Sequence, residues 1–313
     1  MATRYVENVL PVLKAWRAEG HATVLATLVA QDGSAPRPRG SQMAIRADGE
    51  AVGNLTGGCA EAAIIAEAQA RLAAGSNRLL RYGKGSPYID IRLPCGSGID
   101  VFFDIGFAER DLDLVLSANA ARRPASLVFD FEQLRCRAED GALSIDEPTR
   151  WSRTCEPTTR IHAVGKGPLV PLLAQLGSAA EFEVLVWSSE PETLARAEPW
   201  ALEAQTLTTP EAFRCGQLDR WTAFLSLFHE HEWDPPILAQ ALESESFYVG
   251  ALGSRRTAET RREVLRELGV AEDAIARLHG PVGLDLGARS PPEIALAILG
   301  QIVQVRRKGT GRT

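Results

Sequence analysis

The sequence predicts an α/β protein with two domains: an N-terminal mixed α+β domain, then a Rossmann-like domain with a doubly wound parallel sheet. At roughly 100–200 residues per domain, 313 residues suffice for two. Hairpin and meander signals fill the first half, whereas strands and helices alternate in the second, which indicates a parallel sheet. A polar, proline-bracketed segment at 147–159 separates them and predicts a linker. We therefore expect domains at 1–155 and 156–313.

Apolar spacing near 3.6 residues predicts a first helix over 4–19, which Gly20 ends. The dipeptide Asp48-Gly49 between two apolar runs is a strong hairpin signal. The other elements expected in the first half are strands at 21–31, 43–46, 51–55, 79–82 and 100–105, helices at 60–74 and 111–121, and a meander of 126–131, 134–137 and 142–145.

In the second half, short apolar runs alternate with longer amphipathic segments, as in repeated strand–helix units. The expected strands are 160–164, 183–187, 204–208, 221–228 and 247–252, and the expected helices are 168–176, 191–199, 234–243, 254–268, 272–278 and 291–305.

Composition excludes several classes of protein. A net charge of −6 argues against a nucleic-acid-binding surface. No apolar run approaches the roughly 20 residues of a membrane span, and residues 1–7 show no signal peptide, so we expect a cytoplasmic protein without membrane contact. The five cysteines are odd in number and include no C-x-x-C pair, so we expect free thiols rather than disulfides or a zinc ribbon.

One cysteine follows a glycine pair in Thr56-Gly57-Gly58-Cys59-Ala60-Glu61, which joins a predicted strand to a predicted helix. We expect Cys59 at the N-cap or in the first turn, where a helix N-terminus lowers the pKa of a thiol. Glycines 57 and 58 permit positive φ and leave the thiol unshielded. Glu61 could accept a proton, or could raise the thiol pKa by repulsion. A buried, inert cysteine is the alternative.

A second cysteine, Cys95, precedes Gly96 in another glycine-rich turn. Glycines on both turns suggest that a flat or anionic group approaches the backbone. A proline-rich loop that carries Arg37 and Arg39 adds guanidinium groups, which suit phosphates and carboxylates. The remaining cysteines are interpreted as incidental: Cys136, Cys155 and Cys215.

The second half carries an incomplete dinucleotide fingerprint. Gly165 and Gly167 are its first two glycines, but Val170 stands at the third position. The second predicted strand ends in serine where a ribose-binding acid is expected, and Glu190 follows late. The pattern favours a Rossmann-like fold, and an NAD(P)-dependent oxidoreductase remains an alternative function.

Two further motifs follow later strands and should lie at the same carboxyl edge of the sheet. Gly253, Ser254, Arg255 and Arg256 form a strand-to-helix turn that offers backbone N–H groups and two arginines to an anion. The alternative is a capped helix with solvated arginines. His229 and His231 suggest either a metal site with Glu230 or hydrogen-bonded histidines, and 279–288 is a glycine-rich loop.

Together these motifs resemble the xanthine dehydrogenase accessory protein (XdhC/CoxI) family over nearly the whole chain. The resemblance rests on 33–37, 57–61, Cys95-Gly96, 248–256 and 279–289. Details at 91–96 and 227–233 are most similar to members that serve bacterial aldehyde oxidoreductases.

The resemblance implies a chaperone that binds molybdenum cofactor transiently, as molybdopterin or its cytosine dinucleotide form. It implies that the chaperone assists the sulfuration or protection of the cofactor with a cysteine desulfurase. It further implies that the chaperone inserts the cofactor into a xanthine-oxidase-type apoenzyme and has no ordinary enzymatic turnover of its own. Cys59 and Cys95 become the sulfur-handling thiols, and Gly57 and Gly58 become backbone contacts. A resident metal is not expected, and a homodimer is left open.

For the phosphates of that cofactor, the glycine turns, helix N-termini and arginines are the predicted contacts. They are Arg37, Gly96, Gly165, Gly167, Gly253, Ser254 and Arg255. Two departures from the family pattern are Val170, which weakens any claim to nicotinamide binding, and Ser97, which interrupts a run of glycines. A third hypothesis makes the second domain a protein-docking scaffold only.

Overall fold

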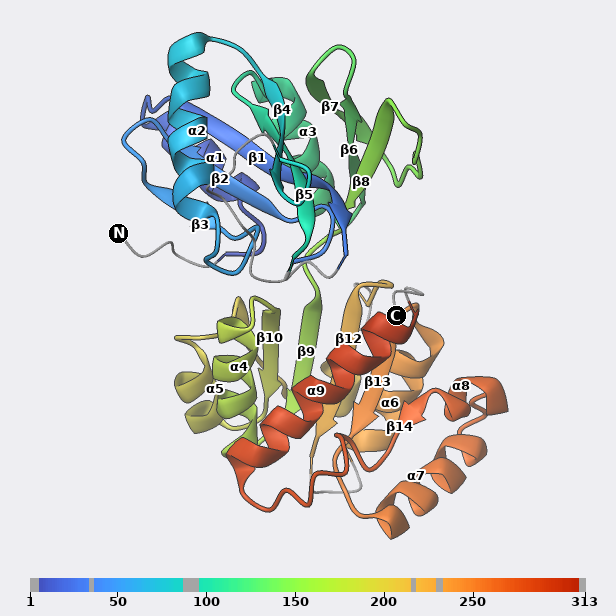
Figure 1. The fold of residues 1–313 in the computed structure, drawn as a ribbon. Helices are drawn as coiled ribbons and strands as arrows, with labels where there is room; N and C mark the ends of the chain where they lie inside the picture. The colour runs from blue at the N-terminus through green and yellow to red at the C-terminus, as the bar shows by residue number, and fades with distance from the viewer. Residues whose placement is uncertain (1–5, 34–36, 87–95, 215–217, 229–232, 310–313) are drawn as a thin grey trace. The chain divides into compact units, whose positions relative to one another are not determined.

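A computed structural model describes residues 6–33, 37–86, 96–214, 218–228 and 233–309. The chain divides into two compact units, Met1–Pro157 and Thr158–Thr313, which run from blue to green and from green to red in Figure 1. Each unit has hydrophobic cores of its own and is described by itself.

The first unit is built on an antiparallel sheet with strands in the order β3-β2-β1-β5-β4. Alternate side chains of β1 enter different cores: Ala26 packs in the core with α2, and Leu25 in the core with α1 and α3. The elements are α1 (Leu10–Ala18), β1 (Thr23–Asp32), β2 (Gln42–Arg46), β3 (Ala51–Gly53), α2 (Glu61–Ala74), β4 (Arg78–Gly83), β5 (Gly98–Asp104) and α3 (Glu109–Ala120).

The first helix is shorter than expected. Instead of spanning 4–19 it begins at Leu10, whose backbone N–H donates to Asn8 Oδ1 at 3.3 Å. Pro11 lies in its first turn, where a missing N–H costs no intrahelical hydrogen bond. The apolar period continues upstream of this start, but the helix does not.

A small sheet in the order β7-β6-β8 completes the unit, from β6 (Ala125–Asp130), β7 (Arg135–Asp140) and β8 (Arg150–Cys155). The expected third strand at 142–145 is wrong, because β8 lies within the segment predicted as linker. Trp151 explains this: it is buried and stacks on Phe129 with ring centroids 5.3 Å apart. Most residues of β8 are polar, so its sequence lacks the alternation of apolar and polar residues that predicts a strand.

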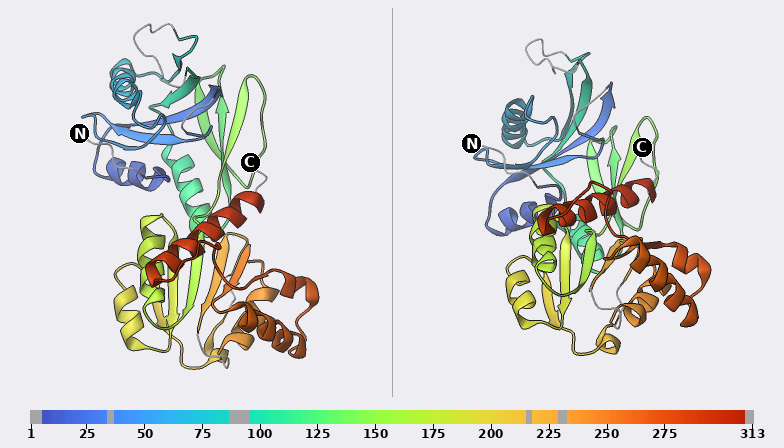
Figure 2. Two further views of the ribbon diagram at one scale, coloured as in Figure 1. Left: turned by 60° about the horizontal axis from the view of Figure 1, so that its bottom comes forward. Right: turned by 90° about the horizontal axis from the view of Figure 1, so that it is seen from below.

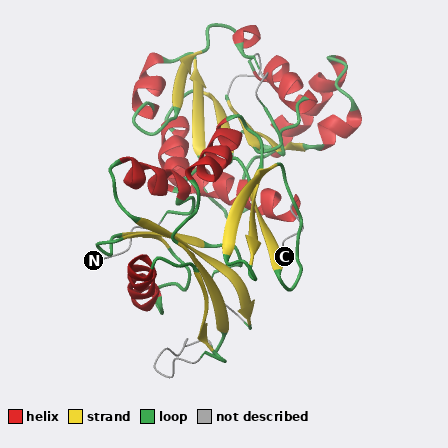
Figure 3. Cartoon of the chain, turned by 90° about the horizontal axis from the view of Figure 1, so that it is seen from above, coloured by secondary structure: helices red, strands yellow, loops and turns green. Residues whose placement is uncertain are grey.

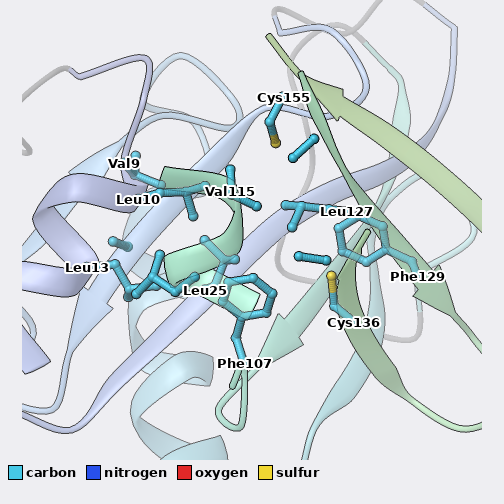
Figure 4. Packing of buried hydrophobic residues seen from close by; sticks show 14 of the residues in the cluster. Val9, Leu10, Leu13, Leu25, Phe107, Val115, Leu127, Phe129, Cys136 and Cys155 are labelled. Carbon is cyan, nitrogen blue, oxygen red and sulfur yellow. The ribbon is translucent and has the colours of Figure 1, made fainter. Parts of the chain in front are cut away.

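Two of the cysteines interpreted as incidental are buried in this unit. Cys136 on β7 and Cys155 on β8 lie among the apolar side chains of the core (Figure 4). Burial raises the pKa of both thiols. They therefore act as small apolar side chains of the core.

The second unit has a parallel sheet in the order β11-β10-β9-β12-β13-β14, the doubly wound arrangement. Its strands are β9 (Arg160–Gly165), β10 (Glu183–Ser188), β11 (Glu203–Thr206), β12 (Thr222–Leu227), β13 (Tyr248–Ala251) and β14 (Leu278–His279). The chain order reverses between β9 and β12, which makes their carboxyl ends the switch point of the sheet. The predicted fold class is confirmed.

Helices cover both faces of this sheet, as Figures 2 and 3 show. One face packs against α4 (Leu169–Ala179), α5 (Pro191–Ala197) and α9 (Pro291–Gly309). The other face packs against α6 (Asp234–Glu243), α7 (Arg255–Glu267) and α8 (Glu272–Ala276). Loops at the carboxyl ends of the strands lead into α4, α6 and α7 and carry the predicted site residues of this unit.

Candidate functional site

The loop at 54–60 joins β3 to α2 and exposes a free thiol; we call it the cysteine loop. Gly57 and Gly58 adopt φ of 74° and 103°, a region that favours glycine. A Cβ on Gly58 would meet no atom within 4 Å, so conformation rather than crowding requires this glycine. Cys59 follows and is exposed. The predicted glycines thus shape an open loop around an accessible sulfur.

Glu61 holds this loop in place. Its buried carboxylate accepts hydrogen bonds from the backbone N–H groups of Thr56 at 2.8 Å, Leu55 at 3.3 Å and Ala60 at 3.3 Å, and from the Thr56 hydroxyl. Burial by itself raises the pKa of Glu61, but these hydrogen bonds outweigh it and hold the pKa below its ordinary value. The side chain is therefore an ionised acceptor directed into the loop.

The helix begins later than the motif predicts. Ala60 is the N-cap of α2 and Glu61 its first residue, so Cys59 lies just outside the helix rather than at its N-cap or in its first turn. The first intrahelical hydrogen bond runs from the Ile64 N–H to the Ala60 carbonyl oxygen at 2.9 Å, and the Ala60 N–H donates to the side chains of Thr56 and Glu61. The thiol stands free of the capping hydrogen bonds.

Of the second cysteine turn, Cys95 lies outside the described residues. Gly96 is exposed, has a φ of 66° and would accommodate a Cβ without contact within 4 Å. The adjacent Ser97 is buried, and its Cα lies 3.8 Å from where a Cβ on Gly33 would stand. Ser97, two residues after Cys95, therefore lies beside Gly33, which precedes the loop that carries Arg37 and Arg39.

The arginines of that loop already have partners in the first unit. Arg37 forms an ion pair with Glu7. Arg39 pairs with Asp146 at 2.7 Å and lies 4.2 Å from the ring centroid of Trp151. An anion that binds Arg37 would thus compete with a carboxylate of the same unit.

In the second unit, the first glycine turn is occupied by a carboxylate. The backbone N–H of Gly167 donates to Glu190 Oε2 at 3.1 Å and to Thr193 Oγ1 at 3.0 Å. In a dinucleotide-binding turn such an N–H faces the pyrophosphate. Gly165 has another role: a Cβ there would stand 2.7 Å from the backbone of Leu227, so β9 and β12 could not approach as they do.

The turn at 253–256 starts α7 as predicted. Ser254 is its N-cap and accepts a hydrogen bond from the N–H of Thr257 at 3.1 Å. Arg255 and Arg256 are exposed, and Arg255 lies 3.9 Å from Asp285 of the glycine-rich loop. This turn and the Gly165–Gly167 turn follow strands of one parallel sheet, with β12 between those strands.

The structure adds a buried ionic cluster that the sequence motifs did not predict. Arg261 of α7 pairs with Asp234 of α6, and Ser226 of β12 donates to the same carboxylate. A signal was present, since Arg261 shares the buried stripe of α7 with Ala258 and Leu265, where a cation is unexpected.

His229, His231 and Cys215 lie outside the described residues, so the histidine hypotheses stay predictions. In the described ranges, no group of three or more His, Cys, Asp or Glu side chains could hold a metal ion. Within the same part of the chain, no helix is long and apolar enough to cross a membrane.

Comparisons with known proteins match this two-unit architecture. The sequence model of the XdhC and CoxI family matches residues 16–83, and that of the XdhC Rossmann domain matches 161–302. A molybdenum cofactor insertion chaperone, PaoD of Escherichia coli, is 32% identical over 92% of this chain and 84% of its own length. The chain belongs to the XdhC and CoxI family. Its predicted resemblance to that family is confirmed.

Other relatives of this XdhC and CoxI protein extend the match. A Bacillus subtilis protein described as a probable subunit of xanthine dehydrogenase is 24% identical over 96% of this chain and 98% of its own. The crystal structure of a xanthine dehydrogenase from Bacillus halodurans superposes with a TM-score of 0.81 at 24% identity and covers 96% of both chains. That likeness shows the shared fold. The family matches include both the cysteine loop and the Gly253 turn.

Proposed function

We propose that this protein is a molybdenum cofactor-binding chaperone that inserts the cofactor into an apo-molybdoenzyme of the xanthine oxidase family. The observation that carries the proposal is the 32% identity to a molybdenum cofactor insertion chaperone along nearly the whole chain. The accessible thiol on an open loop supports it, because thiolates suit soft metals and sulfur chemistry.

In this proposal Cys59 is the group that touches the cofactor or its sulfur, together with Cys95. The cofactor when bound supplies a soft metal with a sulfido ligand, a pterin and a phosphate or pyrophosphate. Gly57 and Gly58 leave the backbone beside the thiol uncovered, since no Cβ stands on either residue. Gly96 does the same for the second turn.

Glu61 is proposed as a positioning residue rather than a proton acceptor. Its carboxylate oxygens accept hydrogen bonds from three backbone N–H groups and one hydroxyl of the loop. A carboxylate so engaged, with a lowered pKa, is a poor base. It acts through the conformation that it gives to Cys59.

Gly253, Ser254 and Arg255 of the second unit are also predicted cofactor contacts, and they offer a helix N-terminus with cationic side chains, which suits a phosphate. Gly165 and Gly167, also predicted contacts, are less suited, because Glu190 presents a carboxylate at that turn. The same carboxylate disfavours the alternative NAD(P)-dependent oxidoreductase, whose pyrophosphate would require this N–H.

Several finer features complete the proposal. The protein acts in the cytoplasm, receives sulfur with the help of a cysteine desulfurase, protects the sulfido ligand and binds its cargo only transiently, without turnover of its own. The proposal includes the cytosine dinucleotide form of the cofactor as an alternative cargo. It also includes a homodimer as a form of the protein.

The test is to express the protein in cells with active cofactor biosynthesis and to identify by mass spectrometry what co-purifies. We expect molybdopterin or its cytosine dinucleotide, and a clear loss with Cys59→Ala but not with the control Cys215→Ala, which removes a cysteine that the sequence predicts to be incidental. Full activation of a client enzyme by a Cys59→Ala/Cys95→Ala double variant would refute the thiol roles. Cofactor retained after deletion of 160–313 would instead favour a docking role for the second unit.

A further inference from the structure

Arg261 carries a guanidinium that is held in one orientation inside the second unit. Its side chain is 4% exposed, and that of its partner Asp234 is 2% exposed. Nη2 donates to Asp234 and to the carbonyl oxygen of Leu252 at 2.9 Å. The Ser226 hydroxyl donates to the other oxygen of Asp234. These bonds pin one side of the guanidinium to the ends of β12 and β13.

The other side of that guanidinium, Nη1, is buried and has no hydrogen-bond partner among the described residues. A buried donor without an acceptor is unfavourable, and more so when it belongs to a charged group. Nη1 lies 3.6 Å from the position that a Cβ on Gly253 would take. It therefore faces the turn before α7, at a residue without a side chain.

The start of α7 is unusually cationic for a helix N-terminus. Arg255 and Arg256 occupy its first turn, which contains no acidic residue. Cations there oppose the helix dipole, whereas an anion is stabilised by it. Arg261 reaches back toward the same turn from the interior, as helical side chains do. Two exposed cations thus follow the exposed Gly253 by two and three positions, and the buried Nη1 of Arg261 faces it from the interior.

We propose that the Gly253 turn binds a phosphate-type anion and that Arg261 Nη1 is its buried donor. The site rests on the structure, and only its natural ligand, the phosphate or pyrophosphate of the cofactor, rests on the proposed function. Asp234 and Ser226 are positioning residues that orient the guanidinium. The Thr257 methyl carbon lies 2.9 Å from the same Cβ position, so it must swing aside when an anion oxygen reaches Nη1.

The test is calorimetric titration of the full-length protein with inorganic phosphate and with pyrophosphate. We expect saturable binding that Gly253→Ala weakens at least tenfold, because the new methyl group fills the approach to Nη1. The control is Gly269→Ala, just after α7: its φ of 83°, like the 151° of Gly253, is rare for a residue with a side chain, but a Cβ there meets nothing within 4 Å. It should bind like the wild type.

Two further variants keep the test decisive if Gly253→Ala folds poorly. Arg261→Lys keeps the charge beside Asp234 but lacks Nη1, and should weaken binding at least tenfold. Thr257→Ser keeps the hydroxyl that contacts Ser254 but removes the obstructing methyl, and should bind at least threefold more tightly. No saturable binding, or equal affinity of wild type and Arg261→Lys, would overturn the proposal.

The two ligands identify the source of the anion, since tighter pyrophosphate binding points to a dinucleotide and tighter phosphate binding to a monoester; both outcomes support the site. Whether the cofactor co-purifies with the protein tests the proposed function independently of this anion site. Co-purified cofactor without phosphate or pyrophosphate binding overturns the site alone. Anion binding that depends on Arg261, in a protein that never carries cofactor, supports the site and overturns the proposed function.

Discussion

The backbone N–H of Gly167 donates a hydrogen bond to Glu190 Oε2 at 3.1 Å. A side chain of the protein thereby takes the place that a pyrophosphate takes in a dinucleotide-binding Rossmann fold. Thr193 joins the same cluster, since its hydroxyl donates to Glu190 at 2.8 Å. The turn is thus satisfied from within the chain.

A first prediction concerns this internal cap. Glu190→Ala should lower the free energy of unfolding by about 1–2 kcal/mol, because the N–H of Gly167 and the hydroxyl of Thr193 lose their charged acceptor. Urea denaturation measures the change. The control is Glu192→Ala, which removes an exposed carboxylate from the first turn of α5, two residues after Glu190. The wild type should give no calorimetric signal with micromolar NAD⁺ or NADP⁺; binding of either would contradict the assignment of Glu190.

A second prediction concerns Glu61. Glu61→Ala should destabilise the protein by about 1–3 kcal/mol, since it leaves several loop donors without their acceptor. It should also diminish cofactor handling in the same way as Cys59→Ala, although the thiol is intact. Glu67→Ala, on the following turns of α2, is the matched control. Normal client activation by a folded Glu61→Ala variant would exclude a positioning role.

The lowered pKa of Glu61 also predicts a pH dependence. A carboxyl whose pKa is lower in the folded than in the unfolded protein contributes stability that is fully present above its unfolded pKa, ordinarily 4.5, and is lost as pH falls through the folded pKa. Wild type should therefore lose more stability below pH 4.5 than Glu61→Gln does. Identical pH profiles of the two proteins in urea melts would argue against an ionised Glu61.

A fourth prediction contrasts two ion pairs of α7. Asp234→Asn should destabilise the second unit by about 3–5 kcal/mol, because it leaves the buried charge of Arg261 uncompensated. Asp285→Asn should have no measurable effect, because Asp285 and Arg255 are almost fully exposed and 3.9 Å apart. Thermal melts of both variants provide the comparison. Equal melting temperatures would show that the Asp234 pair is not buried in solution.

The thiols give a fifth prediction. In a Cys95→Ala/Cys215→Ala background, Ellman's reagent should modify Cys59 in the native protein and Cys136 and Cys155 only after unfolding. Cys59 is exposed, whereas Cys136 and Cys155 are buried and have raised pKa values. Buried thiols with a raised pKa form little thiolate, so they react slowly. Fast native reaction of all three would contradict the described core.

The sequence predicted most of the fold because its periodic signals were strong. Alternating strands and helices identified the parallel sheet, and 234–243 was predicted as a helix with the bounds that α6 has. The predictions of single elements failed where contacts between residues distant in the chain decide the local structure. β8 is polar by sequence and becomes a strand through the packing of Trp151 on Phe129.

The sequence by itself predicted the two-part architecture and the glycine turns at 57–58 and 253, and its motifs resemble the XdhC and CoxI family, because motifs and periodicity are local properties. Only the tertiary structure decided which groups those turns contact. The Glu61 carboxylate is directed into its own loop, and that of Glu190 caps Gly167 across 23 positions. Arg261 meets Asp234 across 27. The pairings of Glu190 and Arg261 arise when packing brings distant elements together and excludes water, and no local pattern encodes them.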